Sequence, residues 1–231
     1  MVPYDPRRVL DHVRRSTVLL ARGAESELRR GTLAGLKTVY KIRVEKPYMD
    51  PRLDYKLRRV RTAREAKVIA VALDSGVSAP RLYMVLPSIG LIAMEYIEGP
   101  RLKEALWAGA VDPAWAGVRA GRVLARLHLA GIVHGDPTTS NYIVRGDELV
   151  LIDYGLSEFS KAVEDRAVDL HLFRRAVEAT HARIAESVYT AFLEGYREVM
   201  GSLADPVMER VGEISLRGRY VEERRKSVWG V

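Results

Sequence analysis

The sequence predicts a two-lobed α+β protein, in which a small strand-rich part precedes a larger helical part. Two observations support this class. Short β-type runs separated by glycine fill much of the first 97 residues, and from residue 101 onward the pattern is mostly helical. Strands and helices segregated in this way are typical of α+β proteins. We place the boundary at "EYIEGP", so that residues 1–97 form the first lobe, 98–216 the second, and 217–231 a basic tail.

The first lobe begins with three runs that have the pattern of strands, "STVLLA", "ESELRRGTL" and "LKTVYKIRV". A long helix follows in "LDYKLRRVRTAREAKVIAVALDSG", where apolar residues recur near helical spacing and Gly76 is expected to end the helix. Two more strands, "RLYMVLP" and "LIAMEYI", are joined by a turn that contains Gly90. In the second lobe, "YIV" and "LVLI" predict a hairpin across "RGDE".

Composition narrows the class of protein. The chain has 231 residues, of which 48% are hydrophobic, enough for one large domain or two small lobes. It has no cysteine, which excludes disulfides and thiolate metal sites, and its five histidines make a dedicated zinc site unexpected. Because it has no run of 18 apolar residues and no signal-peptide core, we expect a cytoplasmic protein without a membrane segment. The net charge of +7 favours a polyanionic partner.

The stretch "VHGDPTTSNYIV", residues 133–144, concentrates polar side chains between two apolar segments. Asp136 precedes Asn141 by five positions, and Asp153 follows at the end of the apolar run "ELVLID". The predicted hairpin would bring the three side chains together. Such a set suits phosphoryl transfer, with Asp136 orienting or deprotonating the acceptor and Asn141 and Asp153 supplying oxygen ligands to Mg²⁺. The alternative is an ordinary polar turn, which Asp-Pro and Ser-Asn also favour.

The pair "HGD…N" and "DYG" resembles the catalytic loop and metal-binding motif of protein kinases. The longer string "HGDPTTSN…LIDYGLS…EDRAVDLHLFRRAVEATH" resembles the small atypical kinase subunit of the KEOPS complex, the family that includes the eukaryotic p53-related protein kinase. The resemblance implies a reduced kinase-like fold that uses ATP and Mg²⁺. It also implies serine/threonine autophosphorylation in isolation and ATPase activity within a complex. That complex contains the threonylcarbamoyladenosine synthase subunit and other small subunits, and it modifies adenosine 37 of tRNA.

The kinase hypothesis predicts nucleotide-binding residues in the first lobe. Lys41 in "TVYKIRV" would face the phosphates and pair with Glu65 of the long helix; the alternatives are a solvated lysine and a glutamate paired locally with Arg61 or Arg64. By resemblance, Gly23 in "GAE" fills the glycine-loop position, where conventional kinases have three glycines, and the role of Glu25 stays open. The backbone groups of Glu95 and Ile97 are expected to meet the adenine. The run "KIRVEKPYMDPRLD" is also similar to the family, except that Met49 replaces an arginine.

Two residues of the second lobe are expected to support this site: His134, which would hold the loop backbone, and Asp169, which would hold the loop from a buried helix. No "APE" follows "DYG", and Gly135 stands where regulated kinases have arginine, so control by activation-loop phosphorylation is not expected. Two other functions stay open. One is a small-molecule phosphotransferase of the aminoglycoside-kinase type, and the other is a tRNA-binding scaffold without catalysis.

The C-terminal segment "EISLRGRYVEERRKSVWGV" is strongly basic and resembles the family's arginine-rich terminal motif. The candidate tRNA contacts are Arg217, Arg219, Arg224, Arg225 and Lys226. The simpler alternative is a solvated tail, which a run of charges usually forms. Each phosphate that these residues neutralise would steepen the salt dependence of tRNA binding.

Overall fold

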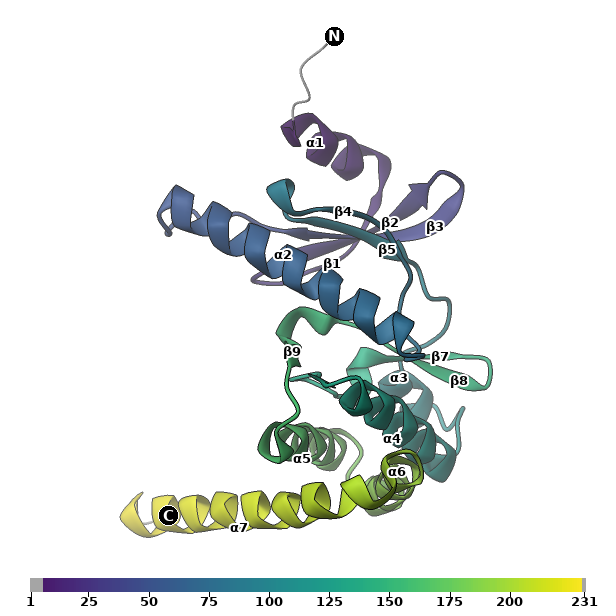
Figure 1. Cartoon of the computed structure of the whole chain (residues 1–231), viewed down its shortest axis with the longest axis vertical. Coiled ribbons are helices and arrows are strands. Elements are labelled where there is room, and N and C mark those ends of the chain that lie inside the picture. The colour runs from purple at the N-terminus through teal and green to yellow at the C-terminus, as the bar shows by residue number, and fades with distance from the viewer. Residues whose placement is uncertain (1–5, 230–231) are drawn as a thin grey trace. The chain divides into compact units, whose positions relative to one another are not determined.

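The computed structural model describes residues 6–229, and the side chains of residues 8–216. The chain divides into two units (Figure 1). The first comprises the residues up to 73 together with 79–97, and the second comprises 74–78 and the residues from 98 onward. The short segment 74–78 belongs with the second unit, where the Ser78 carbonyl accepts a hydrogen bond from Leu151 N at 2.9 Å.

The first unit is a five-stranded antiparallel sheet with a helix on each face. Its strands are β1 (Val18–Arg22), β2 (Ser26–Leu33), β3 (Leu36–Arg43), β4 (Leu82–Leu86) and β5 (Leu91–Glu95), in the order β1-β2-β3-β5-β4. Because side chains alternate along a strand, Tyr40 and Ile42 of β3 pack toward α1 (Pro6–Ser16), around Val13. The opposite face of the sheet packs against α2 (Pro51–Asp74), where Ile92 and Met94 meet Ala66 of α2. The sequence patterns predict all five strands, but α1 is a helix that they do not predict.

The ends of α2 follow from local chemistry. The Asp50 carboxylate accepts hydrogen bonds from Arg52 N and Leu53 N, both at 3.0 Å, and Pro51 opens the helix, where its missing N–H costs nothing. The helix ends at Asp74, and Gly76 has a φ of 75°, which glycine adopts without strain. The helix therefore begins two residues earlier than its apolar periodicity predicts.

The second unit is mostly helical. Its helices are α3 (Leu102–Trp107), α4 (Pro113–Leu129), α5 (Val163–Thr180), α6 (Ala185–Met200) and α7 (Ala204–Trp229). The predicted hairpin is β7 (Tyr142–Arg145) and β8 (Glu148–Leu151), while β6 (Ile132–Val133) pairs with β9 (Glu158–Phe159). Helices α4 and α6 pack so closely that a Cβ at Gly121 of α4 would lie 2.1 Å from the Phe192 carbonyl oxygen of α6. Helix α7 continues through residue 217, where a basic tail was predicted to begin.

Across the part of the chain that the structure describes, no helix combines the length and the apolar character needed to cross a membrane.

Candidate active site

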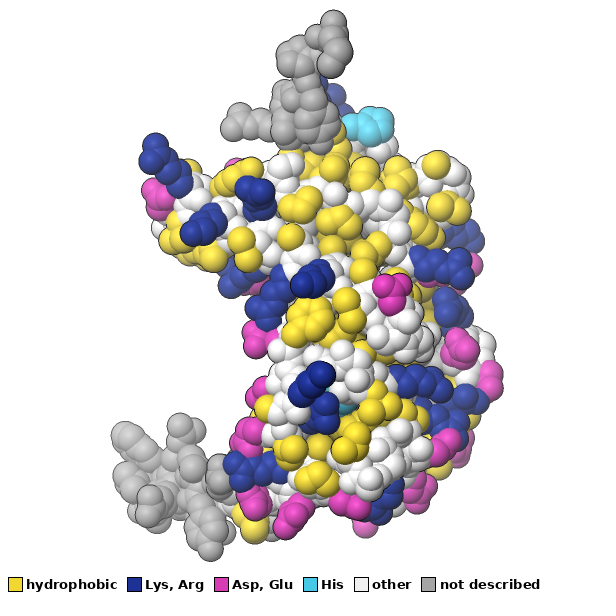
Figure 2. Space-filling view, viewed as in Figure 1, with side chains coloured by type: hydrophobic (Ala, Val, Ile, Leu, Met, Phe, Trp, Pro, Cys, Tyr) yellow, Lys and Arg dark blue, Asp and Glu magenta, His cyan; other side chains and the backbone are white. Residues whose placement is uncertain are grey.

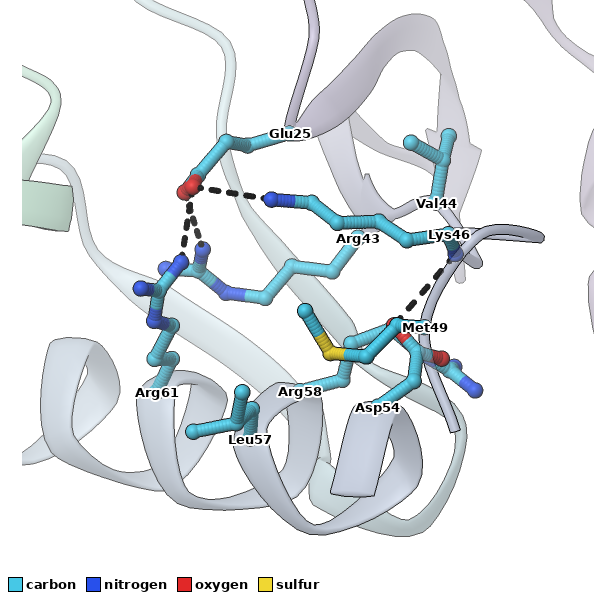
Figure 3. A pocket seen from close by; sticks show the side chains of 9 residues that line it. All are labelled: Glu25, Arg43, Val44, Lys46, Met49, Asp54, Leu57, Arg58 and Arg61. Atoms are coloured by element: carbon cyan, nitrogen blue, oxygen red, sulfur yellow. Dashed lines mark hydrogen bonds and ion pairs between the residues drawn. The ribbon is translucent and has the colours of Figure 1, made fainter. Parts of the chain in front are cut away.

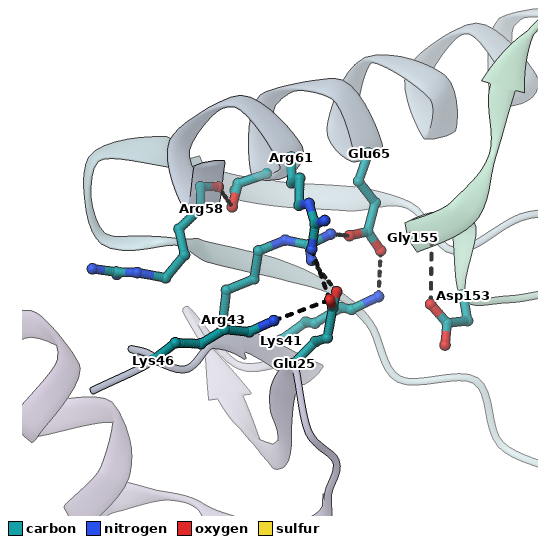
Figure 4. Close-up of polar contacts among 10 residues, drawn as sticks. Glu25, Lys41, Arg43, Lys46, Arg58, Arg61, Glu65, Asp153 and Gly155 are labelled. Carbon is teal, nitrogen blue, oxygen red and sulfur yellow. Dashed lines mark hydrogen bonds and ion pairs between the residues drawn. The ribbon is translucent and has the colours of Figure 1, made fainter. Parts of the chain in front are cut away.

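In the first unit, Lys41 and Glu65 form a buried ion pair (Figure 4). Lys41 Nζ lies 2.5 Å from Glu65 Oε1, and both residues are almost fully buried. Arg43 lies two positions farther along β3, on the same face of the strand, and its guanidinium contacts the other carboxylate oxygen at 2.6 Å. A single carboxylate in the middle of α2 therefore pairs with two buried cations of β3. Glu65 does not form the local pair with Arg61 that was the alternative.

Glu25 lies in the loop between β1 and β2, where it is the shared acceptor of three basic side chains (Figure 3). Its carboxylate accepts hydrogen bonds from Arg61 at 2.7 Å and Lys46 at 3.3 Å, and it lies 3.6 Å from Arg43. The hydrogen bond from Arg61 is the largest influence that lowers the pKa of Glu25. These contacts connect the β1–β2 loop to α2 and to the end of β3. They show where Glu25 lies, which the sequence did not predict.

The loop that carries Glu25 also contains Gly23. Its N–H donates to the Ser26 carbonyl at 2.9 Å, and a Cβ at this position would meet only that oxygen, at an ordinary 3.7 Å. The fold of the unit therefore does not itself require glycine here.

A small pocket lies beside this loop, between the loop, the end of β3 and the first turns of α2. Its lining is shown in Figure 3: Glu25, Arg43, Val44, Lys46, Met49, Asp54, Leu57, Arg58 and Arg61. Asp54 accepts from Lys46 N at 3.3 Å and from Arg58 at 2.7 Å. Five of the fourteen residues in the run "KIRVEKPYMDPRLD" thus line this pocket, and Met49 is one of its apolar residues.

Strand β5 ends at Glu95, and Ile97 lies in the segment that follows it. The N–H of Glu95 donates to the Arg81 carbonyl at 2.8 Å, and Tyr96 N donates to the Lys37 carbonyl at 3.0 Å. Of the backbone groups of Glu95, the N–H is therefore committed to the fold, and its carbonyl is the group that could meet an adenine.

In the second unit, Asp136 and Asn141 are joined directly. The side-chain amide of Asn141 donates to the Asp136 backbone carbonyl at 2.8 Å and to its carboxylate at 2.9 Å. This orientation commits the amide nitrogen to Asp136, so the amide oxygen is the atom that could bind a cation. Burial raises the pKa of Asp136 from its ordinary value, against the lowering effect of the Asn141 hydrogen bond, and the nearby charge of Asp153 raises it further.

Asp153 is brought to the same place by the hairpin. Ile152 N donates to the Asn141 backbone carbonyl at 2.8 Å, which fixes the following residue beside Asn141. Asp153 itself has a φ of 63°, a conformation that costs a non-glycine residue of the order of 1–3 kcal/mol and is concentrated at functional sites. Its carboxylate accepts a hydrogen bond from Gly155 N at 3.4 Å.

The loop is held from inside the unit by Asp169 of α5. This buried carboxylate accepts hydrogen bonds from His134 N at 2.6 Å and Gly135 N at 2.8 Å. The His134 ring is also fully buried: Nε2 lies 3.2 Å from the Ile152 carbonyl, and Nδ1 accepts from Asp136 N at 3.3 Å. Such a pattern requires a neutral ring with its proton on Nε2, in agreement with burial, which lowers the pKa of His134.

Gly135 is required by its surroundings. Its φ is 81°, and a Cβ would lie 2.7 Å from the backbone oxygen of Leu156. An arginine at this position, as in regulated kinases, is therefore sterically excluded.

Two residues of this network were not predicted from the sequence. His128 of α4 lies 3.0 Å from the Asp169 carboxylate through Nε2 and 2.8 Å from the Tyr196 hydroxyl through Nδ1. Since the carboxylate must accept, Nε2 carries the proton and Tyr196 donates to Nδ1. The signal for His128 is a histidine within the otherwise apolar "LARLHLAG", which is buried because its polar atoms have partners.

Among the described residues, no three His, Cys, Asp or Glu side chains gather as a metal site would require. A cation held by Asn141 and Asp153 would therefore take its other ligands from phosphate or water. The candidate tRNA contacts Arg217, Arg219, Arg224, Arg225 and Lys226 fall in α7, beyond the last residue whose side chain is described.

The chain is similar in sequence to known proteins over most of its length. It is 41% identical over 212 residues to the KEOPS complex subunit Bud32 of Pyrococcus abyssi, which covers 88% of this chain and 96% of that protein. It is 39% identical over 204 residues to a probable bifunctional tRNA threonylcarbamoyladenosine biosynthesis protein of Methanothermobacter thermautotrophicus. That match covers 88% of this chain but only 37% of the bifunctional protein, so the chain spans little more than a third of relatives of this kind.

Solved structures share the fold. An amicoumacin kinase, hAmiN, in complex with AMP-PNP, Ca²⁺ and Ami, matches with a TM-score of 0.59 and 15% identity over 85% of this chain and 78% of that chain. WaaP in complex with acyl carrier protein matches with a TM-score of 0.63 and 16% identity over 96% of this chain and 93% of that chain. At such identities the likeness concerns the fold alone, and it confirms a kinase-like α+β architecture.

Residues 53–188, more than half of the chain, match the family described as the ABC1 atypical kinase-like domain. Together with the 41% identity to a protein that is matched along almost its whole length, this match confirms the resemblance noted in the sequence. The chain belongs to the ABC1 atypical kinase-like family and, within it, to the family of KEOPS complex subunit Bud32.

Proposed function

We propose that this protein is an ATP-dependent phosphotransferase, a serine/threonine kinase or ATPase, that supports threonylcarbamoyladenosine formation at adenosine 37 of tRNA as a KEOPS subunit. The observation that carries the proposal is the 41% identity to a KEOPS subunit, which extends over 96% of that protein. The bifunctional relatives support it, since their names join a related sequence to the same tRNA modification in one chain. The protein would act in the cytoplasm, with the threonylcarbamoyladenosine synthase subunit and other small subunits as partners.

Asp136 is the residue that we propose to act on the phosphate acceptor. Its carboxylate is oriented by the Asn141 amide at 2.9 Å, and it is half-buried, so it can accept a proton from a hydroxyl or water held at the loop. Because burial raises its pKa, the basic form is lost at a higher pH than for an ordinary aspartate.

Asn141 and Asp153 fit the requirements of Mg²⁺. Hard cations of this kind are bound through one or two protein oxygen ligands together with substrate phosphates, and these residues offer an amide oxygen and a carboxylate on adjacent positions of the hairpin. When bound there, Mg²⁺ would neutralise charge on the transferring phosphate. Asp153 would be placed for this by its constrained backbone, whose φ is 63°.

In the first unit, we propose that Lys41 contacts the ATP phosphates and that Glu65 fixes its position. Gly23 lies in the loop expected to approach the phosphates, and the fold leaves room at that position, because a Cβ would make only an ordinary contact there. The Glu95 carbonyl and the Ile97 backbone would meet the adenine. The tRNA would be contacted in part by the basic residues at the end of α7: Arg217, Arg219, Arg224, Arg225 and Lys226.

The test of the site is Asp153→Ala, compared with Asp147→Ala in the turn of the same hairpin, where the carboxylate is exposed. We expect Asp153→Ala to abolish Mg²⁺-dependent ATP turnover with at most a small fall in the thermal unfolding midpoint, because alanine keeps the positive φ and loses only the hydrogen bond from Gly155 N. Asp147→Ala should retain turnover. Turnover of the wild-type level in Asp153→Ala would contradict the metal assignment.

The role in tRNA modification is tested with the reconstituted complex. ATP hydrolysis and threonylcarbamoylation are measured with and without this chain, the synthase subunit and tRNA. We expect modification to continue through repeated cycles only when this chain is present and Asp153 is intact. If modification is the same without this chain, the proposed function is wrong.

A further inference from the structure

We propose that the solvent-facing side of α2 is an RNA-docking surface that binds a run of backbone phosphates. The residues that form it, Arg52, Lys56, Arg59 and Lys67, are called the α2 stripe below. The choice of RNA as the partner rests on the proposed function, whereas the surface itself follows from the charge and exposure of α2.

The α2 stripe lies on a single face of the helix. Its members occupy positions i, i+4, i+7 and i+15, which lie on one side at 3.6 residues per turn. The opposite side carries the buried Asp54, Glu65 and Ile69, so the stripe faces away from the sheet. All four members are exposed, and basic side chains gather over the N-terminal half of α2 in Figure 2.

Acids give the N-terminal part of this surface little compensation. Helix α2 contains three acids: Asp54 and Glu65 are buried in ion pairs with residues outside the stripe, and Asp74 is the last residue of the helix, 15 positions beyond Arg59. Among the described residues, no ion pair includes Arg52, Lys56 or Arg59. Neighbouring like charges at i, i+3 and i, i+4 repel one another, so the stripe is unfavourable for the helix alone.

Three arginines of the second unit, in contrast to Arg52 and Arg59, have an acidic partner. Arg119 lies 2.6 Å from Asp147, Arg122 lies 2.7 Å from Glu198, and Arg197 lies 2.9 Å from Asp205. These three arginines therefore provide a matched comparison for Arg52, Lys56 and Arg59, which form no ion pair within the described part of the chain.

A phosphate backbone matches this surface better than a protein partner does. At 1.5 Å per residue, positions 52–67 extend over roughly 22 Å, enough to follow several consecutive phosphates. Release of counterions from those phosphates would provide the free energy of binding. The centres of protein–protein interfaces, in contrast, are depleted of charged residues and enriched in aromatic ones. The α2 stripe has the composition of a nucleic-acid surface.

The experiment uses the full chain with Arg52→Gln, Lys56→Gln and Arg59→Gln combined. The matched control combines Arg119→Gln, Arg122→Gln and Arg197→Gln, which removes the same charge from positions that already have acidic partners. Binding of a tRNA transcript is measured by fluorescence anisotropy across a salt series. ATP turnover without RNA, expected to be unchanged in both variants, shows that the fold and site are intact.

If three phosphate contacts are lost, the slope of log affinity against log salt should fall by about 2, and affinity at low salt by roughly 10- to 100-fold. The control should retain most of the slope. Equal losses in both variants would show that only net charge matters and would overturn the proposal, as would an unchanged slope in the α2 variant. Weaker binding of the synthase subunit without RNA, with tRNA binding intact, would make the stripe a protein interface instead.

Failure of this proposal is distinguishable from failure of the proposed function. If the wild-type chain supports threonylcarbamoylation in the complex but the α2 variant binds tRNA normally, only the docking surface is wrong. If the wild-type chain does not support modification, the proposed function is wrong whatever the salt slopes are.

Discussion

Replacing Glu65 with leucine removes the carboxylate that Lys41 and Arg43 share, at 2.5 and 2.6 Å. All three side chains are at least nine-tenths buried, so the two cations cannot be compensated by water without opening the interface between β3 and α2. Breaking a buried ion pair by removing one partner costs about 3–5 kcal/mol. We therefore expect the first unit to lose most of that amount in Glu65→Leu, with Arg43 left to the carboxylate of Glu25 at 3.6 Å.

The triple variant Lys41→Met, Arg43→Met, Glu65→Leu separates stability from catalysis. Replacing a buried ionic group by apolar side chains of similar volume is often neutral or stabilising, so most of the lost stability should return. ATP turnover should be absent, since the proposed contact of Lys41 with the phosphates is lost. This outcome would show that the three charged side chains of the wild-type protein serve the reaction and do not stabilise the fold.

Unfolding by urea, followed by circular dichroism, measures the stability of each variant, and phosphate release measures turnover. The control is Glu198→Leu, whose half-exposed pair with Arg122 should contribute no more than about 1 kcal/mol. An unfolding midpoint of Glu65→Leu equal to that of Glu198→Leu would refute the reasoning. So would a triple variant less stable than Glu65→Leu, because the charges would then have been stabilising together.

Two further predictions concern the second unit. Burial lowers the pKa of His128 below its ordinary 6.5, so the unfolded chain takes up a proton at a higher pH than the folded chain. The contribution of His128 to the free energy of unfolding is then complete above pH 6.5 and is lost as the pH falls, by at most about 1.4 kcal/mol per pH unit for each such histidine. His128→Gln should reduce the slope of the unfolding free energy against pH. An identical slope in the variant would show that His128 does not take up a proton on unfolding. Gly135→Ala should cost about 1–3 kcal/mol and lower ATP turnover, because the new Cβ would lie 2.7 Å from the Leu156 oxygen. The control Gly146→Ala, with a φ of 59° and no atom within 4 Å of the added Cβ, should cost about 1 kcal/mol and leave turnover unchanged.

The fold was predictable wherever one face of an element is buried against a neighbour. The strands of the first unit and the long helix α2 have apolar positions at strand or helix spacing, and the glycines at 76 and 90 have the positive φ that such turns need. Helix α1 escaped prediction because its apolar face is only Val9, Leu10 and Val13 among charged residues. The sequence analysis treated residues 217–231 as a separate tail because they are strongly basic, but a run of charged residues does not prevent a helix from continuing.

Residues of the candidate site could be predicted where the proposed chemistry requires a particular residue type. They could not be predicted where their role depends on ion pairs between residues far apart in the sequence. Asp136, Asn141 and Asp153 are recognisable because a hairpin of known length brings them together. The contacts of Glu25 and Arg43 cannot be recognised in this way, because the sequence does not reveal that Arg43 bridges Glu65 and the β1–β2 loop. A cation on the same strand face as Lys41 is the only signal, and it is found in many strands without such a role.

The loop that contains Asp136 is held by contacts in the interior of the second unit. Nine residues lie between Asp153 and Val163, where α5 begins, and part of that segment is β9, which pairs with β6. Gly135 cannot be exchanged for the arginine that would contact a phosphorylated activation segment, because the Leu156 backbone occupies the space. The loop backbone is instead fixed by the Asp169 carboxylate, which is oriented in turn by His128 and Tyr196. Since Asp169, His128 and Tyr196 are buried, the loop reaches its conformation through contacts within the unit, without the arginine that contacts phosphate in regulated kinases.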